Sequence, residues 1–337
     1  MNIKGLLIGS AAALVAVSGA RAADAIVAAE PEPLEYVRVC DAFGSGYFYI
    51  PGTETCLKIG GYLRLDVRGG ELLGLDASGA NGTLGDEWDT RSRFSFRVST
   101  ASDTEYGALK TYSELRFNWR QGNNTVEVKH AYIDLAGFRV GKTDSAFITY
   151  TDYAGAVLVD DLIDFGTDDT NVIQYNYDSG TGVTAIVSLE DFADAANNYV
   201  PNIVGGVGYG TDAFGIKVLG GYDSSREEGA IKARIDGDFG GFSAFVMAGW
   251  NTDGTVRNDY ATWDGDWAVW GGVSVPVTEK VKFNAQLAYD DSKTFAANAN
   301  FAFTVVKGFV ITPEIAYRDL NGTTDAWGGI VRFQRSF

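Results

Sequence analysis

Residues 281–289 decide the fold class. They read Val281-Lys-Phe-Asn-Ala-Gln-Leu-Ala-Tyr289, with apolar side chains at every odd position and polar or small ones at every even position. Because successive side chains of a strand point to opposite faces of its sheet, this period of two predicts a β-strand with one apolar and one polar face. The same alternation recurs along the chain, often with arginine or lysine on the polar face. The sequence therefore predicts an all-β protein.

About sixteen runs of this kind follow one another. The connections between them alternate between short ones, such as 239–241, and longer polar ones, such as 252–265. Short turns on one side and long loops on the other are typical of outer-membrane barrels, whose strands span a bilayer with about 9 to 11 residues. We therefore predict a 16-stranded antiparallel transmembrane β-barrel over residues 57–337, with a soluble extracellular β protein as the alternative. The predicted strands lie near 57–68, 89–100, 107–119, 126–135, 137–143, 171–178, 182–190, 202–210, 215–223, 229–238, 241–251, 266–275, 280–290, 294–305, 308–318 and 326–337.

The N-terminus has the pattern of a signal peptide. Lys4 supplies a positive start, residues 5–19 are apolar and uncharged, and Ala20-Arg21-Ala22 fits a small-x-small cleavage site. We expect residues 1–22 to be removed; a membrane anchor is the competing interpretation, although the apolar run is short for a span. Residues 23–56 would then form an N-terminal periplasmic segment, and the formal charge of −17 would fall by two with the loss of Lys4 and Arg21.

Composition argues against several functions. With 44 acidic against 27 basic side chains, the chain lacks the basic surface that nucleic acid requires. His130 is the sole histidine, and no G-x-S-x-G motif marks a serine nucleophile, so we expect no enzyme and no cofactor. The aspartates near residues 160–169 lack EF-hand spacing, so we predict no dedicated metal site, although incidental calcium binding stays open.

Cys40 and Cys56 are the only two cysteines, and the segment between them is rich in turn residues. In an exported chain this arrangement predicts a disulfide, which would close a loop of about 15 residues and contribute roughly 3 kcal/mol in the chain-entropy model. Two free thiols, or a metal site without a nearby histidine, are the alternatives.

Three stretches together resemble the general porins of alphaproteobacteria, of the rhizobial and Brucella type: 36–62 (YVRVCDAFGSGYFYIPGTETCLKIGGY), 263–272 (WDGDWAVWGG) and 326–337 (AWGGIVRFQRSF). The resemblance covers essentially the whole mature chain. It implies a homotrimer in contact with outer-membrane lipid, with a third extracellular loop folded into the pore. The terminal Phe337 resembles the signal that the barrel assembly machinery recognises.

The longest part of the strand region without alternation, near 142–170, matches that constriction loop by position, although a solvated acidic surface loop is the alternative. Its carboxylates are Asp144, Asp152, Asp160, Asp161, Asp164, Asp168 and Asp169. We expect these carboxylates to balance basic side chains on the polar faces of the early strands and to set a field across the pore. The basic residues concerned are Arg64, Arg68, Arg91, Arg93, Arg97, Lys110, Arg116 and Arg139.

The expected function is passive diffusion of small hydrophilic solutes and ions, with a weak preference for cations. A sugar-preferring channel would need an aromatic track along the lumen, and Tyr112, Tyr132 and Phe245 are too scattered to show one. A barrel serving mainly as an adhesin or structural anchor is the other alternative. We also expect the 252–265 loop to be distal to the pore, so that Asp253 and Asp259 have little influence on selectivity.

Overall fold

The computed structural model describes residues 38–74, 87–192, 199–320, 322 and 324–337. The chain divides into two compact units, Met1–Arg38 and Val39–Phe337, and the account below concerns the second. The signal peptide predicted for residues 1–22, and the part of the 23–56 segment before residue 38, lie outside the described residues.

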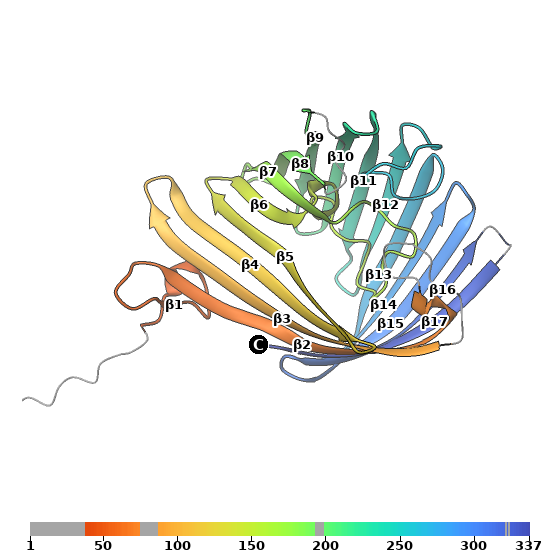
Figure 1. The fold of residues 1–337 in the computed structure, drawn as a ribbon, viewed down its shortest axis with the longest axis horizontal. Helices are drawn as coiled ribbons and strands as arrows, with labels where there is room; N and C mark the ends of the chain where they lie inside the picture. The colour runs from red at the N-terminus through yellow and green to blue at the C-terminus, as the bar shows by residue number, and fades with distance from the viewer. Residues whose placement is uncertain (1–37, 75–86, 193–198, 321, 323) are drawn as a thin grey trace, which may run out of the picture. The chain divides into compact units, whose positions relative to one another are not determined.

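One continuous antiparallel sheet forms the second unit (Figure 1). Each strand from β2 to β17 pairs with its neighbour in the chain, and β17 pairs with β2, from Gly328↔Gly70 to Ser336↔Tyr62. This last pairing closes the sheet into a 16-stranded barrel, which confirms the predicted fold class. The strands are β1 (Phe48–Tyr49), β2 (Cys56–Gly70), β3 (Glu87–Thr104), β4 (Gly107–Arg120), β5 (Asn123–Leu135), β6 (Phe138–Asp144), β7 (Asp169–Asp178), β8 (Val183–Asp191), β9 (Asn202–Gly210), β10 (Phe214–Asp223), β11 (Glu228–Asp238), β12 (Ser243–Asn251), β13 (Trp267–Thr278), β14 (Val281–Asp290), β15 (Thr294–Val306), β16 (Phe309–Leu320) and β17 (Thr324–Ser336).

Burial in these strands is inverted relative to a soluble protein. In β14, Gln286 is 3% exposed whereas the neighbouring Leu287 is 57% exposed, and the other strands repeat the pattern. Apolar side chains on the open face suit lipid, and closure satisfies the backbone groups that lipid cannot. We call the opposite face, which carries Asn284 and Gln286 in β14, the polar face. No helix among the described residues is long and apolar enough to cross a membrane.

The N-terminal end of the barrel is tied by the predicted disulfide, which joins Cys40 to Cys56 at the first residue of β2. Between them lie a short 3-10 helix, η1 (Asp41–Phe43), and the two-residue strand β1, which pairs with β2 at Phe48↔Leu57. Neither short element is foreseen from alternation, because each is too brief to show a period.

The connection between β6 and β7, residues 145–168, is the β6–β7 segment. It begins with one helical turn, α2 (Ala146–Thr149), whose first backbone groups are capped by the Ser145 hydroxyl accepting from the Phe147 N–H. Its apolar side chains join a buried cluster with residues of the strands and of the 252–266 loop, including Met247, Trp263 and Trp270. The β6–β7 segment is therefore packed against the barrel rather than left in solvent.

Candidate functional site

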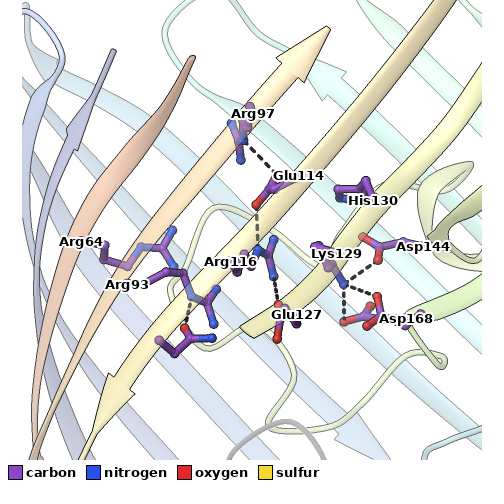
Figure 2. Close-up of polar contacts among 12 residues, drawn as sticks. Arg64, Arg93, Arg97, Glu114, Arg116, Glu127, Lys129, His130, Asp144 and Asp168 are labelled. Atoms are coloured by element: carbon purple, nitrogen blue, oxygen red, sulfur yellow. Dashed lines mark hydrogen bonds and ion pairs between the residues drawn. The ribbon is translucent and has the colours of Figure 1, made fainter. Parts of the chain in front are cut away.

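Both ends of the β6–β7 segment meet at one buried lysine. Lys129 on β5 places its Nζ 2.6 Å from Asp144 Oδ1 and 2.7 Å from Asp169 Oδ1, with Asp168 Oδ2 at 3.8 Å (Figure 2). The Ser145 N–H also donates to the Asp168 carbonyl over 2.7 Å, which joins the two ends directly. Three of the predicted aspartates thus balance a lysine that sequence reasoning missed.

Beyond this junction, residues 156–165 form the part of the segment that we call the arm. Gly155 and Gly166 bracket it, and both have positive φ, 105° and 139°, a region that favours glycine. The arm is hydrogen-bonded to polar-face side chains of β11, β13, β14, β15 and β16; for example, the Trp270 indole N–H donates to the Ile163 carbonyl over 2.8 Å.

An acidic cavity of about 640 Å³ lies beside the arm. Its charged lining residues are Asp160, Asp161, Asp164, Asp168, Asp169, Asp264, Asp290, Arg257 and Arg318, so carboxylates outnumber guanidinium groups. Among the described residues, no group of His, Cys, Asp and Glu side chains is arranged to hold a metal ion. The cavity therefore presents a cluster of carboxyl groups beside the arm.

The protonation of this cavity changes near neutral pH. Burial, together with the charge of Asp161, raises the pKa of Asp160 to about 8 and that of Asp164 to about 7. Burial also raises the pKa of Asp168 to about 6, against the opposing effect of Lys129. Part of the negative charge in the cavity is therefore gained only as the pH rises through neutrality.

Basic side chains gather on the polar face of the strands on either side of the β2–β17 pairing, and we call them the arginine cluster. Its members are Arg64, Arg68, Arg91, Arg93, Arg97, Arg116, Arg120 and Arg332. Glu114 binds Arg97 at 2.8 Å and Arg116 at 2.7 Å, and Arg116 reaches on to Glu127 at 3.4 Å (Figure 2). Arg64 and Arg93 instead bind the amide oxygens of Gln334 and Asn118.

The counter-charges of this cluster differ from those expected. Arg68 pairs with Asp89 at 2.7 Å, and Arg91 and Arg332 both bind Asp66, at 2.9 and 2.7 Å. These carboxylates, like Glu114, stand on neighbouring strands and not on the β6–β7 segment. The physical reason is register, because antiparallel pairing places them within reach of the arginines before any loop can approach.

Three of the other predicted charged residues, Arg139, Lys110 and Asp152, lie outside both the Lys129 junction and the arginine cluster. Arg139 forms a bidentate pair with Asp134 at 2.8 and 2.9 Å, and Lys110 is exposed near the start of β4. Asp152 is exposed and pairs with Lys217 of β10 at 2.8 Å. Of these, Arg139 also approaches the contacts around Glu114, because its guanidinium lies 4.0 Å from the ring centroid of Tyr132.

The expected scatter of aromatic residues is wrong for two of the three. Tyr112 and Tyr132 are register partners on β4 and β5, with ring centroids 5.4 Å apart, and His130 lies 5.7 Å from the Tyr112 ring. A β-bulge between Glu114 and Leu115 shifts the register and brings the three rings together on the polar face. Phe245, on β12, instead packs with Arg234, whose guanidinium lies 4.1 Å from its ring centroid.

The expectation for the 252–265 loop is also wrong in part. The Asp259 carbonyl accepts from the Thr167 N–H over 3.0 Å, and the Thr262 hydroxyl accepts from the Gly166 N–H over 2.8 Å. This loop therefore packs on the β6–β7 segment, and Asp259 is not distal to it. Asp253 is exposed and caps its own turn by accepting from Thr255.

A closed barrel with an apolar outer face and charged side chains on its polar face defines a class of protein, the outer-membrane β-barrel channels. Within this class, the sequence model of the family described as "Porin subfamily" matches residues 24–331, and the chain belongs to this family. It is an outer-membrane porin channel, and the family identity implies passive passage rather than catalysis.

Curated relatives and solved structures agree with this assignment. The chain is 46% identical over 368 aligned residues to Porin Omp2b of Brucella suis biovar 1 and equally to that of Brucella melitensis biotype 1, each alignment covering 100% of both chains. The outer membrane channel DcaP of Acinetobacter baumannii has a similar fold, with a TM-score of 0.66 at 16% identity over 86% of this chain and 99% of that one. A mutant of Rh. blastica porin matches with a TM-score of 0.62 at 13% identity, over 83% of this chain and 100% of that one.

Proposed function

We propose that the polar face lines a water-filled lumen, that the β6–β7 segment lies across this lumen as its constriction, and that the channel weakly prefers cations. The observation that carries this proposal is the acidic cavity beside the arm, where carboxylates outnumber the two arginines. Rings of acidic side chains are a known device of cation-selective pores. Six of the eight arginines in the arginine cluster pair with four strand carboxylates, Asp66, Asp89, Glu114 and Glu127, so the influence of the cluster on a passing ion is reduced but not abolished.

The test is single-channel recording in planar bilayers with a KCl gradient across the membrane. Replacing Asp160, Asp161 and Asp164 with Asn should move the reversal potential toward anion preference while the channel stays open. Asp253→Asn removes an exposed loop carboxylate that caps its own turn, so it is the matched control and should leave the reversal potential unchanged. An unchanged reversal potential in the triple variant, with conductance intact, would refute the charge role of the cavity.

We further propose that three barrels assemble as a homotrimer in the outer membrane and that the chain reaches this state through the barrel assembly machinery. Support for assembly through the C-terminus comes from Phe337, whose N–H and carbonyl form a reciprocal pair with Gly61 at 3.1 Å. Removal of the Phe337 side chain by Phe337→Ala should reduce the amount of assembled protein in outer-membrane fractions, and a matched Phe242→Ala change in a short turn should not.

The neighbouring rings of Tyr112 and Tyr132 favour a second candidate function, passage of sugars. Aromatic rings beside paired charges, here Arg97–Glu114 and Arg139–Asp134, combine an apolar surface with hydrogen-bonding groups. Liposome swelling measures sugar entry directly. If the tyrosines assist sugars, the Tyr112→Ala/Tyr132→Ala variant should slow swelling with disaccharides more than swelling with uncharged non-sugar solutes of similar size; equal slowing of both would exclude this candidate.

A further inference from the structure

The arm has no strand as a partner, so the side chains of the barrel wall must satisfy its backbone. Following the arm from Ala156 to Phe165, the bonding side chains come from strands in order around the wall, with β12 passed over: β15 and β16, then β14, then β13, then β11. The bonds are Asn300 to the Ala156 carbonyl (3.1 Å), Glu314 to the Leu158 and Val159 N–H groups (2.9 Å for Val159), Asn298 to the Val159 carbonyl (2.9 Å), Gln286 to the Asp160 carbonyl (2.8 Å), Trp270 to the Ile163 carbonyl (2.8 Å) and Lys232 to the Phe165 carbonyl (2.8 Å).

Glu314 differs from every other member of this set. The others donate to arm carbonyls, whereas Glu314 accepts, and it is the one side chain in the set that receives backbone N–H groups. One carboxylate oxygen takes the Leu158 N–H and the other takes the Val159 N–H, while Asn300 Nδ2 donates to the first of these oxygens over 2.9 Å. Glu314 is 6% exposed, so water cannot readily replace it as an acceptor.

We propose that Glu314 is the positioning residue that holds the arm against the wall formed by β11–β16 and thereby fixes the open width of the lumen. This inference rests on the proposed role of the β6–β7 segment as the constriction. The amide donors Asn298, Asn300 and Gln286 are uncharged and each makes one bond to an arm carbonyl, and the amine of Lys232 also makes only one, at the far end of the arm. Glu314 instead clamps two consecutive N–H groups with an ionised group, and such charge-assisted bonds are roughly twice as strong as neutral ones.

The substitution Glu314→Gln tests this role because the glutamine side chain has nearly the same shape as the glutamate side chain but lacks its charge. A glutamine keeps one oxygen for one N–H, but its NH₂ group meets the second N–H, so donor faces donor where the carboxylate accepted. Leaving a buried N–H without an acceptor shifts the balance between the bound and the released arm by roughly tenfold or more. The released arm would intrude on the lumen, so the current should fall intermittently to lower levels.

The experiment is single-channel recording of the whole protein in planar bilayers. The Glu314→Gln channel should spend roughly tenfold more time in lower-conductance levels than the parent. Glu279→Gln, in the exposed turn between β13 and β14, makes the same chemical change away from the arm. This control channel should spend no more time in lower-conductance levels than the parent. A Glu314→Gln channel with steady current would overturn the proposal.

A cross-link separates positioning from a general loss of stability. In the Glu314→Gln background, Val159→Cys and Asn298→Cys place one thiol on the arm and one on the wall, at two residues that are joined by the bond from the Asn298 amide to the Val159 carbonyl. Oxidation should suppress the lower levels and reduction should restore them, while reduction of Glu314→Gln alone, which opens only the native disulfide, should change nothing. Lower levels that persist after complete cross-linking would overturn the proposal.

Two further measurements keep the outcomes distinct. If Glu314→Gln does not assemble, the Asn298→Ala/Asn300→Ala variant weakens the same contacts and should show the same lower levels; a steady current there would again refute the role of this wall contact. If the Asp160, Asp161 and Asp164 substitutions leave selectivity unchanged while Glu314→Gln still produces lower levels, the charge role fails and the positioning role stands.

Discussion

Cation preference should rise between about pH 6 and about pH 8, because three carboxyls of the acidic cavity titrate in this range. Their pKa values are raised to about 8 for Asp160, about 7 for Asp164 and about 6 for Asp168. A carboxyl is neutral below its pKa and negative above it, so a raised pKa delays the gain of charge to higher pH. Across this interval the cavity gains about two negative charges.

The size of the effect follows from Coulomb's law. A monovalent cation about 8 Å from one carboxylate in a water-filled lumen is stabilised by roughly 0.5 kcal/mol, and two carboxylates contribute roughly 1 kcal/mol. That energy corresponds to about a fivefold rise in the local cation concentration, with anions depleted in proportion. Because screening acts over about 10 Å at 0.1 M salt, the effect should weaken as the salt concentration is raised.

Reversal potentials measured across a pH series in a KCl gradient test this reasoning. The Asp160→Asn/Asp164→Asn variant removes the two carboxyls of the cavity whose pKa values are highest, so its reversal potential should change less with pH than that of the parent. His130 also lies on the polar face and is the only histidine, so His130→Gln is the control for imidazole titration and should keep most of the response. A parent channel whose reversal potential does not change with pH, or a double variant with the full response, would refute the assignment of these carboxyls to the ion path.

Four further outcomes are expected. Arg97→Gln and Arg93→Gln should each raise cation preference in bilayer recordings, because each removes one positive charge from the arginine cluster; lower preference would contradict this. Lys129→Met should lower the thermal stability of the barrel by about 3 kcal/mol, since it leaves Asp144 buried without its cation, and circular dichroism on heating would measure the change. Mild-detergent electrophoresis should show an oligomer that becomes a monomer on boiling, whereas a monomer at every temperature would count against the trimer. Mass spectrometry without reduction should find Cys40 and Cys56 linked within one chain, and two alkylatable thiols would contradict the structure.

The strands were predictable because lipid imposes a simple rule on them. Every one of the sixteen predicted runs corresponds to a strand, and the boundaries differ by at most four residues, at the end of β3, where the structure continues to Thr104. The rule acts locally, since each strand must alternate whatever its neighbours are. It fails where the chain is not exposed to lipid, so β1 and the helical turn α2 left no pattern to detect.

The site was predictable only in part. The acidic character of the β6–β7 segment is visible in the sequence, but its contacts join residues far apart in the chain: Gln286 and Asp160 are 126 positions apart, and Glu314 and Leu158 are 156 apart. Alternation does not tell which polar side chain of a strand meets the arm, since all of them share one face. Alternation places Lys129 on the polar face, opposite to the exposed Val126 and Val128, but its partners Asp144 and Asp169 stand at the ends of β6 and β7, so the pattern within β5 could not single it out.

The pairing of β2 with β17 couples the order of folding to the permeability of the membrane. Asp66 is 0% exposed and receives Arg91 from the next strand and Arg332 from a position 266 residues away. The second contact exists only after the two ends of the sheet have met, and the entropy of closing so long a loop makes this a late event. A partly inserted sheet would therefore lack both its closed wall and a balanced Asp66, so the charge pairing of the arginine cluster is completed in the same step that closes the barrel wall.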